Sequence, residues 1–272
     1  MSYKQNLHIH STYCDGKDRP EEMIREAIRR GFDSIGFSEH SYMYFSRYAN
    51  QMTAQRTEEY KAEIAALKEK YRGTIDIFCG MEVEMHSQVS LTGFDYLIGS
   101  LHYLDFDGQI CGFDSNLEKT LAYLRDHFGG DGMAFARKYF ETLCRLPEKG
   151  NFNILGHFDL ITKNNEQGRF IDTESREYLH AGLETIHALK GEIPLFEVNT
   201  GAIARGYRTA PYPQMEFLKE FRSCGFGAVI TSDCHNKDFV DCYFDEAAQL
   251  LEQAGFRTKW ILTDEGFRET AL

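Results

Sequence analysis

Segments with strand patterns alternate with segments with helical patterns along nearly the whole chain, and this alternation limits the possible folds more than any other feature. Apolar runs typical of buried strands occupy 6–11, 34–37, 75–79, 94–100, 153–155, 195–198 and 228–231. Helical patterns occupy 18–31, 53–71, 115–127, 131–146, 173–190, 213–223 and 239–254, and a short strand is expected at 258–262. Repeated strand–helix units predict a largely parallel sheet with helices packed against it.

Length and composition fit one globular α/β domain. The 272 residues suffice for one barrel, and no linker or low-complexity tract divides them, so we expect a single domain over 1–272. No apolar run reaches the roughly 18 residues of a membrane span, and the N-terminus lacks a signal-peptide layout. The seven cysteines include no Cys-x-x-Cys pair and are expected to be reduced. We therefore expect a cytoplasmic protein that does not bind a membrane.

The charge balance bears on possible partners. The formal net charge of −12 is unfavourable for binding a nucleic-acid backbone, which requires clustered Lys and Arg. No nucleic-acid partner is expected. A small anionic substrate remains compatible with this charge, because bound metal cations can invert the sign of the local field. The oligomeric state is left open.

Acids and imidazoles follow almost every predicted strand. The first run, Leu7-His8-Ile9-His10, places two imidazoles on one strand face, since alternate side chains point the same way. Active sites of parallel α/β barrels form at the C-terminal strand ends. The residues predicted to gather there are His8, His10, Asp15, His40, Glu82, His102, His157, Asp233 and His235. By contrast, the mid-helix residues His127, His180 and His187 are interpreted as structural or solvated.

A cluster of this composition predicts a transition-metal centre. Each ion needs about three or four protein ligands, so nine ligands can hold two or three ions. Imidazole mixed with carboxylate favours Zn, Fe or Mn over Mg or Ca. Such ions lower the pKa of bound water and so supply a nucleophile at neutral pH, which points to hydrolysis.

The ordered set His8-x-His10, Asp15, His40, Gly-x-Glu82, His102, Gly-His157-x-Asp159 and Ser-Asp233-x-His235 resembles the PHP (polymerase and histidinol phosphatase) superfamily, in its stand-alone histidinol-phosphatase form. The resemblance runs over almost the whole chain. It implies a distorted TIM-like (βα)7 barrel with a trinuclear metal centre at the C-terminal ends of the strands.

The resemblance also implies which residues share an ion. The first ion would be held by His8, His10, Glu82 and Asp233. Glu82 would bridge to a second ion, completed by His102 and His157. A third would be held by Asp15, His40 and His235, although many relatives carry His at the position of Asp15. Glu84 competes with Glu82 because both share a strand face, and Glu82 is preferred for its place two residues after Gly80.

A phosphate monoester also needs cationic contacts on its oxygens. The segment after Asn199-Thr200 carries Arg205 and Arg208, and Lys163 lies just past the fifth strand. In the histidinol-phosphatases that the chain resembles, the corresponding segment after an Asn-Thr pair carries an Arg. The resemblance therefore implies that Arg205 first, then Arg208 and Lys163, contacts phosphate, and that Arg205 stabilises charge during the reaction. Asp159 is a candidate proton donor to the leaving group. It could equally orient a metal ligand or cap the following turn.

These residues predict a metal-dependent phosphomonoesterase, and the resemblance makes L-histidinol phosphate the first substrate. Other small phosphomonoesters or nucleotides are the nearest alternative. An amidohydrolase-type deaminase also begins with His-x-His, but that family usually has a lysine after strand four, which this chain lacks. A nuclease and a non-enzymatic metal-binding protein are the remaining hypotheses.

The aromatic segment 42–48 could cover the site as a lid or pack on the barrel rim.

Overall fold

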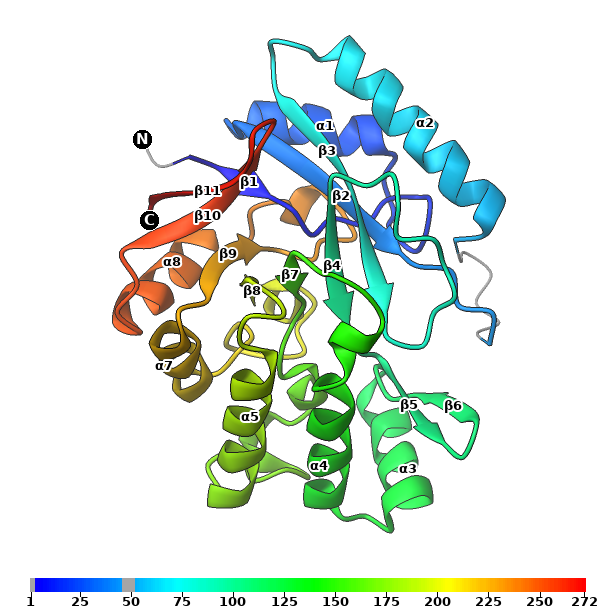
Figure 1. The fold of residues 1–272 in the computed structure, drawn as a ribbon, viewed down its shortest axis with the longest axis vertical. Coiled ribbons are helices and arrows are strands. Elements are labelled where there is room, and N and C mark those ends of the chain that lie inside the picture. Colours follow the sequence, from blue (N-terminus) through cyan, green and yellow to red (C-terminus); the bar gives the residue numbers. More distant parts are fainter. Residues whose placement is uncertain (1–2, 46–51) are drawn as a thin grey trace.

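The computed structural model describes residues 3–45 and 52–272, so Ser46 to Tyr48 of the proposed lid segment lie outside the described residues. Within that part, one sheet has the strand order β1-β2-β3-β4-β7-β8-β9, and every neighbouring pair is parallel. The strands are Gln5–Asn6, Ser34–His40, Asp76–Glu84, Tyr96–Ser100, Ile154–Leu155, Leu195–Asn199 and Gly227–Thr231 (Figure 1). The seven strands match the predicted apolar runs.

The two edges of this sheet meet just beyond β1 and β9. Ile9 and Cys234 form an isolated parallel bridge, in which His10 N donates to Cys234 O at 3.0 Å and Cys234 N donates to His8 O at 3.3 Å. The sheet therefore curves into a nearly closed barrel, which confirms the predicted distorted (βα)7 fold. The distortion includes the β3–β4 connection, which carries no helix over residues 85–95.

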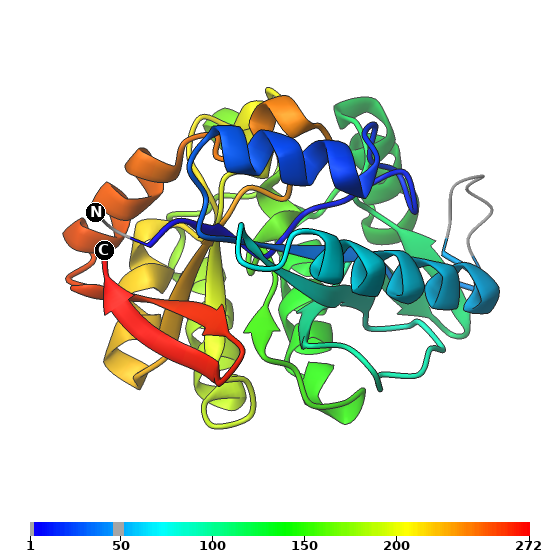
Figure 2. The same ribbon diagram turned by 90° about the horizontal axis from the view of Figure 1, so that it is seen from above.

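Helices cover the outer face of the barrel (Figures 1 and 2). They are α1 to α8, spanning Pro20–Arg29, Ala54–Lys70, Leu117–Phe128, Gly132–Leu143, Arg176–Leu189, Gly201–Ala204, Met215–Cys224 and Phe244–Gln253. Asp131 caps α4, because its side chain accepts from Met133 N and Ala134 N. Asn116 caps α3, because its side chain accepts from Lys119 N. None of the helices in the described part is long and apolar enough to cross a membrane.

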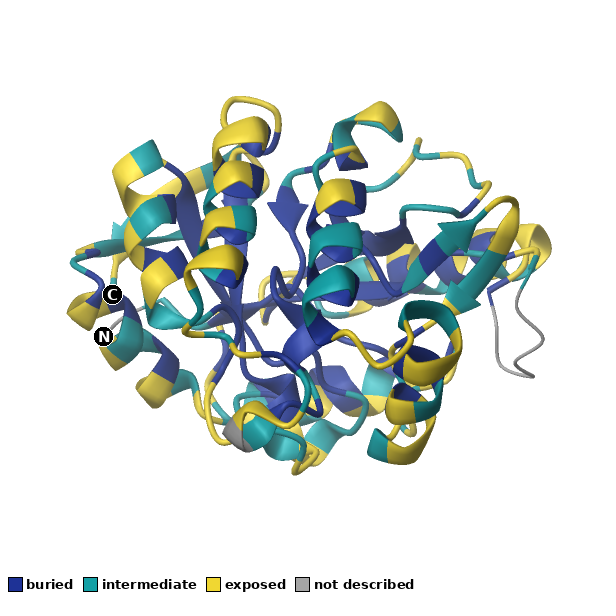
Figure 3. Cartoon of the chain, turned by 90° about the horizontal axis from the view of Figure 1, so that it is seen from below, coloured by how far each residue is buried: buried dark blue, intermediate teal, exposed yellow. Residues whose placement is uncertain are grey.

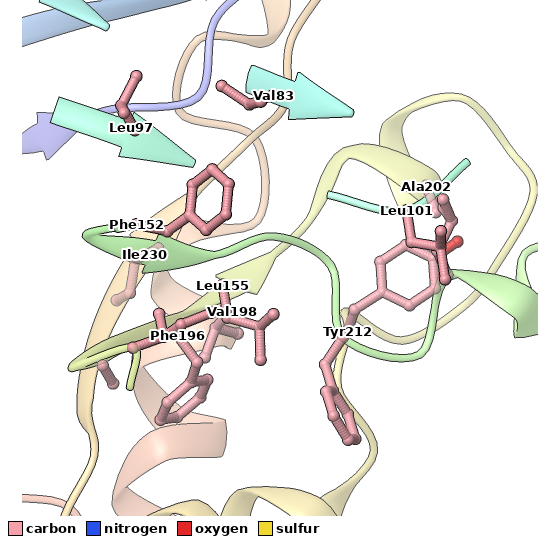
Figure 4. Close-up of a cluster of buried hydrophobic side chains, with 14 of the residues drawn as sticks. Val83, Leu97, Leu101, Phe152, Leu155, Phe196, Val198, Ala202, Tyr212 and Ile230 are labelled. Atoms are coloured by element: carbon pink, nitrogen blue, oxygen red, sulfur yellow. The ribbon is translucent and has the colours of Figure 1, made fainter. Parts of the chain in front are cut away.

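Strand alternation separates two cores. In β8, Phe196 and Val198 face outward into the main core beneath the helices, and Leu195 belongs to a second cluster inside the barrel. Figure 4 shows part of the main core, with Val83, Leu97, Leu155, Phe196, Val198 and Ile230 among its labelled side chains. The inner cluster comprises Leu7, Phe78, Tyr96, Ile98, Ile154, Leu195, Val229 and Leu262. Most of these lie in the N-terminal halves of their strands, so apolar packing fills that end of the barrel.

Two hairpins were not predicted as such, although the strand expected at 258–262 is confirmed as part of the second one. The pair β5 (Tyr103–Phe106) and β6 (Gln109–Gly112) follows β4, and β10 (Thr258–Thr263) pairs with β11 (Gly266–Ala271) at the C-terminus. The second hairpin lies beside β1 and β9 (Figure 1), where Gln5 exchanges two hydrogen bonds with Leu262. The exposed residues of both hairpins are mostly polar, so the apolar periodicity of these segments in the sequence is weak.

Figure 3 shows that the strands of the barrel are mostly buried, whereas the outer surfaces of the helices are exposed.

Packing of α7 on β8 offers a test of the outer core. Phe221 is fully buried and stacks on Phe196 with ring centroids 4.3 Å apart. Phe221→Ala is expected to lower the free energy of unfolding by about 3–5 kcal/mol, because it leaves a cavity among aromatic rings. Phe239→Ala, at a ring that is 41% exposed, is the matched control and should change it by about 0.5 kcal/mol or less. Urea unfolding measures both, and equal losses would contradict this packing.

Candidate metal centre

The nine predicted ligands converge at the C-terminal end of the barrel. His40 ends β2, Glu82 lies within β3, and the other seven lie on segments that follow β1, β4, β7 and β9. His8, His10, Glu82, His157 and Asp233 are buried, whereas Asp15 is 53% exposed at its side chain. The inner cluster of apolar residues supports this group from below.

Glu82 is the centre of the group. Its Oε2 lies 2.8 Å from His40 Nδ1, 3.4 Å from His8 Nε2 and 3.5 Å from His10 Nε2. Its Oε1 lies 2.8 Å from His157 Nε2 and 3.4 Å from His102 Nε2. One carboxylate thus faces five imidazoles, an arrangement suited to a bridging ligand.

Two further carboxylates contact the remaining imidazole, that of His235, and also imidazoles that face Glu82. Asp233 Oδ1 lies 3.3 Å from His10 Nε2 and 3.7 Å from His235 Nδ1. Asp15 Oδ1 lies 3.2 Å from His235 Nε2 and 3.6 Å from His40 Nε2. Asp15 therefore stands where the predicted third ion would be held.

The donor geometry fits metal ions. Three overlapping groups have ligand atoms within 4.8 Å of one another: His8, His10 and Asp233; His8, Glu82 and His157; and His10, Asp15, His40 and His235. In the described part of the chain, His8 Nε2, His10 Nε2 and Glu82 Oε2 are buried and lack any hydrogen-bond partner. Unpartnered buried donors and acceptors are costly, and shared cations would satisfy them. His102 belongs to none of the three groups, although its ring faces Glu82.

Burial and opposite charges shift the pKa values in this group. Burial alone disfavours the Glu82 carboxylate, but His40, His8 and His102 hold its pKa well below the usual value. Burial and the neighbouring His235 and His40 lower the pKa of His10 to about 3. A neutral imidazole and an ionised carboxylate are the forms that ligate metals.

Carboxylates in a second layer orient the imidazoles. Glu197 Oε2 lies 2.8 Å from His8 Nδ1, and its Oε1 accepts from His157 N at 2.6 Å. Glu84 Oε2 lies 3.0 Å from His102 Nδ1. Such partners fix the ring tautomer and leave the other nitrogen for the metal. Glu84 thus lies behind His102, and Glu82 holds the central position that was preferred for it.

His10 has a similar partner on its outer side. Cys14 Sγ lies 3.4 Å from His10 Nδ1 and donates to Glu39 Oε2 at 2.8 Å. Glu39 also accepts from Ser11 N and Oγ. Glu39 and Glu197 were not predicted, although each is an acid inside a buried strand, which is itself unusual.

Backbone geometry around Asp233 brings a guanidinium next to the cluster. Asp233 has a φ of 43°, a left-handed conformation that costs energy in a non-glycine residue and is frequent at functional sites. Gly201 packs against the backbone of Ser232, so closely that an added Cβ would come within 2.7 Å of Ser232 O. Arg205 Nη1 donates to Asp233 O at 2.7 Å, and Nη2 donates to Asp233 Oδ2 at 3.0 Å.

A cavity of about 450 Å³ opens over the cluster. Its lining includes Arg205 and Lys163, in agreement with their predicted position at the site. The lining residues are Asp15, His40, Glu82, His102, Asp114, Ser115, Asn116, His157, Leu160, Lys163, Arg205, Tyr207, Asp233 and His235. Asp114, Ser115, Asn116 and Tyr207 were not predicted, because they lie on loops with no strand-end signal.

Asp159 and Arg208 do not line this cavity, so their positions do not support the roles predicted for them. Asp159 is fully buried, accepts from Gln214 N at 3.2 Å, and has a pKa raised by burial. Arg208 hydrogen-bonds Thr162 Oγ1 and lines a different cavity with Gln214. The guanidinium of Arg208 also lies 4.5 Å from the centre of the Tyr212 ring, so these contacts direct it away from the cluster.

The mid-helix histidines lie outside the cluster, as predicted. His180 and His187 have side chains 65% and 59% exposed on α5. His127 stacks on Phe106 with ring centroids 4.5 Å apart. Strand-end placement therefore distinguished the clustered histidines from these three.

Comparisons with known proteins agree with this geometry. The profile of the PHP domain family matches residues 6–200. The histidinol-phosphatase of Bacillus subtilis (strain 168) is 33% identical over 254 residues, covering 85% of this chain and 93% of that protein. The histidinol-phosphatase of Lactococcus lactis subsp. lactis (strain IL1403) is 26% identical over 273 residues, covering 93% of this chain and 92% of that protein.

A solved structure shares the fold. Histidinol phosphate phosphatase from Lactococcus lactis subsp. lactis, crystallised with zinc, L-histidinol and phosphate, matches with a TM-score of 0.75 and 21% sequence identity. The match covers 97% of this chain and 98% of that chain.

Metal binding is expected to weaken as the pH falls. Burial alone would lower the pKa of His40, but Glu82 and Asp15 raise it to about 10. Against the effect of burial, Glu197 and Glu82 raise the pKa of His8, and Glu82 raises that of His102. With a pKa of about 10, His40 carries a proton near neutral pH in the metal-free protein, so an ion must displace it and the metal affinity rises with pH. Calorimetric titration with Zn²⁺ from about pH 6 to about pH 9, in two buffers of different ionisation enthalpy, measures this release. Affinity independent of pH would contradict it.

Glu197→Gln tests the second layer of carboxylates. The substitution keeps the side-chain shape but removes the charge facing His8 and His157, and should weaken metal binding about 10- to 100-fold. Competition with a chromophoric chelator measures the affinity. Glu184→Gln, at a carboxylate 69% exposed on α5, is the matched control. If both variants bind metal as the unaltered protein does, Glu197 has no such role.

Proposed function

Because this chain belongs to the PHP domain family, we propose that it is a metal-dependent phosphomonoesterase that converts L-histidinol phosphate and water to L-histidinol and phosphate. The observation that carries the proposal is the cavity over the cluster, which is lined by seven of the nine potential metal ligands and by Arg205. A binding protein without catalysis would not need an open cavity beside its ligands.

The residues proposed to hold metal are His8, His10, Asp15, His40, Glu82, His102, His157, Asp233 and His235. Two or three divalent ions fit this set, and zinc accompanies the related protein from Lactococcus lactis. When bound, such ions polarise a phosphoryl group and lower the pKa of water. Glu197, Glu84 and Glu39 hold the imidazoles in place, so the ligands are oriented before an ion binds.

Arg205 is proposed to bind the phosphoryl oxygens. Its side chain is 29% exposed and lines the cavity, and its guanidinium is held by Asp233. The fork of N–H donors matches two phosphate oxygens, and their added charge in the transition state strengthens these bonds. Lys163 lines the same cavity and adds a second cation. Asp159 and Arg208, which lie elsewhere, are given no catalytic part.

Other phosphomonoesters remain the second candidate, since the cluster and Arg205 recognise phosphate rather than its alcohol. A nucleic-acid partner is still not expected, given the net charge of −12. The amidohydrolase alternative loses its basis, because the family match and the position of His40 and His235 in the cluster agree with a PHP centre.

The direct test is phosphate release by protein reconstituted with Zn²⁺, Mn²⁺ or Fe²⁺. The substrates are L-histidinol phosphate, nucleoside monophosphates, phosphotyrosine and sugar phosphates. We expect the highest kcat/KM with L-histidinol phosphate and loss of activity after chelation or in His8→Ala. Preference for another ester would overturn the substrate, and no phosphate release from any ester would overturn the phosphatase.

Arg205→Met tests the phosphate contact. Removing the guanidinium is expected to lower kcat/KM by about 100-fold or more, since one charge-stabilising donor contributes about that factor. Arg205→Lys should recover part of the loss. Arg72→Met, at a side chain 74% exposed on the surface, is the control. Because Arg205 also bonds Asp233, metal content is measured in each variant. Full activity in Arg205→Met with normal metal content would exclude this role.

A further inference from the structure

The alcohol half of the proposed substrate poses a recognition problem that the metal cluster does not answer. L-Histidinol phosphate carries a protonated amine two carbons from its ester oxygen, as well as an imidazole. A buried ammonium needs an anionic or polar partner. The inference below rests on the proposed function and concerns which residue supplies that partner.

The cavity lining contains few carboxylates. Asp15, Glu82 and Asp233 are among them, and all three belong to the proposed metal-ligand set. Asp114 also lines the cavity and lies outside that set. It is therefore a carboxylate in this cavity that metal ions would leave available to a substrate cation.

The hairpin after β4 brings Asp114 to the cluster. His102 precedes β5 and Phe113 follows β6, and Phe113 N donates to His102 O at 3.1 Å. The strands of the hairpin pair in register from Tyr103 with Gly112, so the chain returns to the point where it left the barrel. Asp114 therefore directly follows Phe113, whose backbone is hydrogen-bonded to that of the proposed metal ligand His102.

A second contact anchors the same segment from the other side of the cavity. Asn164 Nδ2 donates to Ser115 O at 2.8 Å and to Thr120 Oγ1 at 3.0 Å. Asn164 follows Lys163, whose Nζ donates to Asp114 Oδ1 at 2.6 Å. These hydrogen bonds therefore hold Asp114 and the segment that carries it in a defined position at the cavity.

Local charges keep this carboxylate ionised. Burial opposes ionisation, but Lys163, His102 and Arg205 lower the pKa of Asp114. Its side chain remains 26% exposed, whereas that of Lys163 is 13% exposed. An ionised carboxylate offers about four lone-pair sites, so the bond from Lys163 leaves room for another donor.

Lys163 itself is engaged on two sides. Besides its bond to Asp114, its Nζ lies 4.6 Å from the centre of the Tyr207 ring. Tyr207 also lines the cavity. The lysine thus balances the charge of Asp114 when no substrate is bound, and the ring offers an apolar wall to the alcohol half.

We propose that Asp114 is a specificity-determining residue that accepts a hydrogen bond from the protonated amine of the substrate, while the phosphate lies toward Arg205 and the cluster. The cavity then selects phosphomonoesters whose alcohol carries a cation. Asp114 acts on binding of the alcohol half and takes no part in the bond that breaks.

The test compares two esters that differ only in the amine: L-histidinol phosphate and 3-(imidazol-4-yl)propyl phosphate. In the unaltered enzyme we expect kcat/KM to favour the amine-bearing ester by about 10- to 100-fold, the usual factor for a hydrogen bond to a charged group. In Asp114→Asn this ratio should fall close to unity, chiefly through a higher KM for the amine-bearing ester. Asp114→Glu should retain part of the preference.

Controls separate recognition from structure. Asp126→Asn makes the same change at a carboxylate 57% exposed on α3 and should leave the ratio unchanged. Lys163→Met should keep a preference for the amine, since the carboxylate remains. If Asp114→Asn slows both esters equally and Lys163→Met does the same, Asp114 only positions Lys163 and the proposal is overturned. An unchanged ratio in Asp114→Asn overturns it as well.

A second pair of esters separates this inference from the proposed function. 2-Aminoethyl phosphate and propyl phosphate have nearly the same shape and differ in charge. If the enzyme does not hydrolyse L-histidinol phosphate yet prefers 2-aminoethyl phosphate, and Asp114→Asn removes that preference, the inference holds and the proposed substrate fails. If L-histidinol phosphate is hydrolysed but neither preference depends on Asp114, the inference fails and the proposed function holds.

Discussion

Closure of the barrel between Ile9 and Cys234 is the constraint on which the rest of the site depends. The bridge uses the backbone of His8, Ile9, His10 and Cys234, so it fixes the segments that carry proposed ligands at both ends of the chain. His8 and His10 come from the first strand region, and Asp233 and His235 from the last, more than 220 residues later. Without closure, nothing in the chain would bring these four side chains next to one another. Asp233, with its left-handed conformation, directly precedes the bridged Cys234.

Strand alternation then decides what lies within the barrel. On β8 the inward residues are Leu195, Glu197 and Asn199, which change from apolar to charged to amide along one face. On β3 the series is Phe78, Gly80, Glu82 and Glu84. The N-terminal half is therefore dry and packed, and the C-terminal half carries buried carboxylates. Those carboxylates are tolerable only because imidazoles oppose them, as the lowered pKa of Glu82 and of Glu197 and the raised pKa of His8 show. A metal ion replaces protons in this balance.

The strands and the convergence of the candidate ligands could be predicted because both leave a short-range signal. An apolar run followed by His or Asp marks a strand end, and parallel strands must bring those ends together, which is how His40, His102 and His157 were found. Glu197 gave a weaker signal, because it is an acid within an apolar run. A search for polar residues at strand ends does not detect it. Asp114 and Tyr207 gave none, since their place depends on the hairpin and on contacts such as Asn164 with Ser115. Asp159 and Arg208 lie outside the cavity because Gln214 N and Thr162 Oγ1 hold their side chains, and spacing in the sequence does not reveal such contacts.

These observations divide the site into two parts with different physical requirements. The metal ligands sit on strand ends and on a closed barrel, where backbone pairing leaves little freedom, as a polynuclear centre requires. The residues that face the alcohol half sit on the segment after a hairpin and on the loops that carry Lys163 and Tyr207, which can change without disturbing the sheet. A carboxylate on the second part can alter substrate choice while Glu82 and its five imidazoles keep the same chemistry. Under the proposed function, the metal centre is built into the barrel, and recognition of the alcohol is built into the loops attached to it.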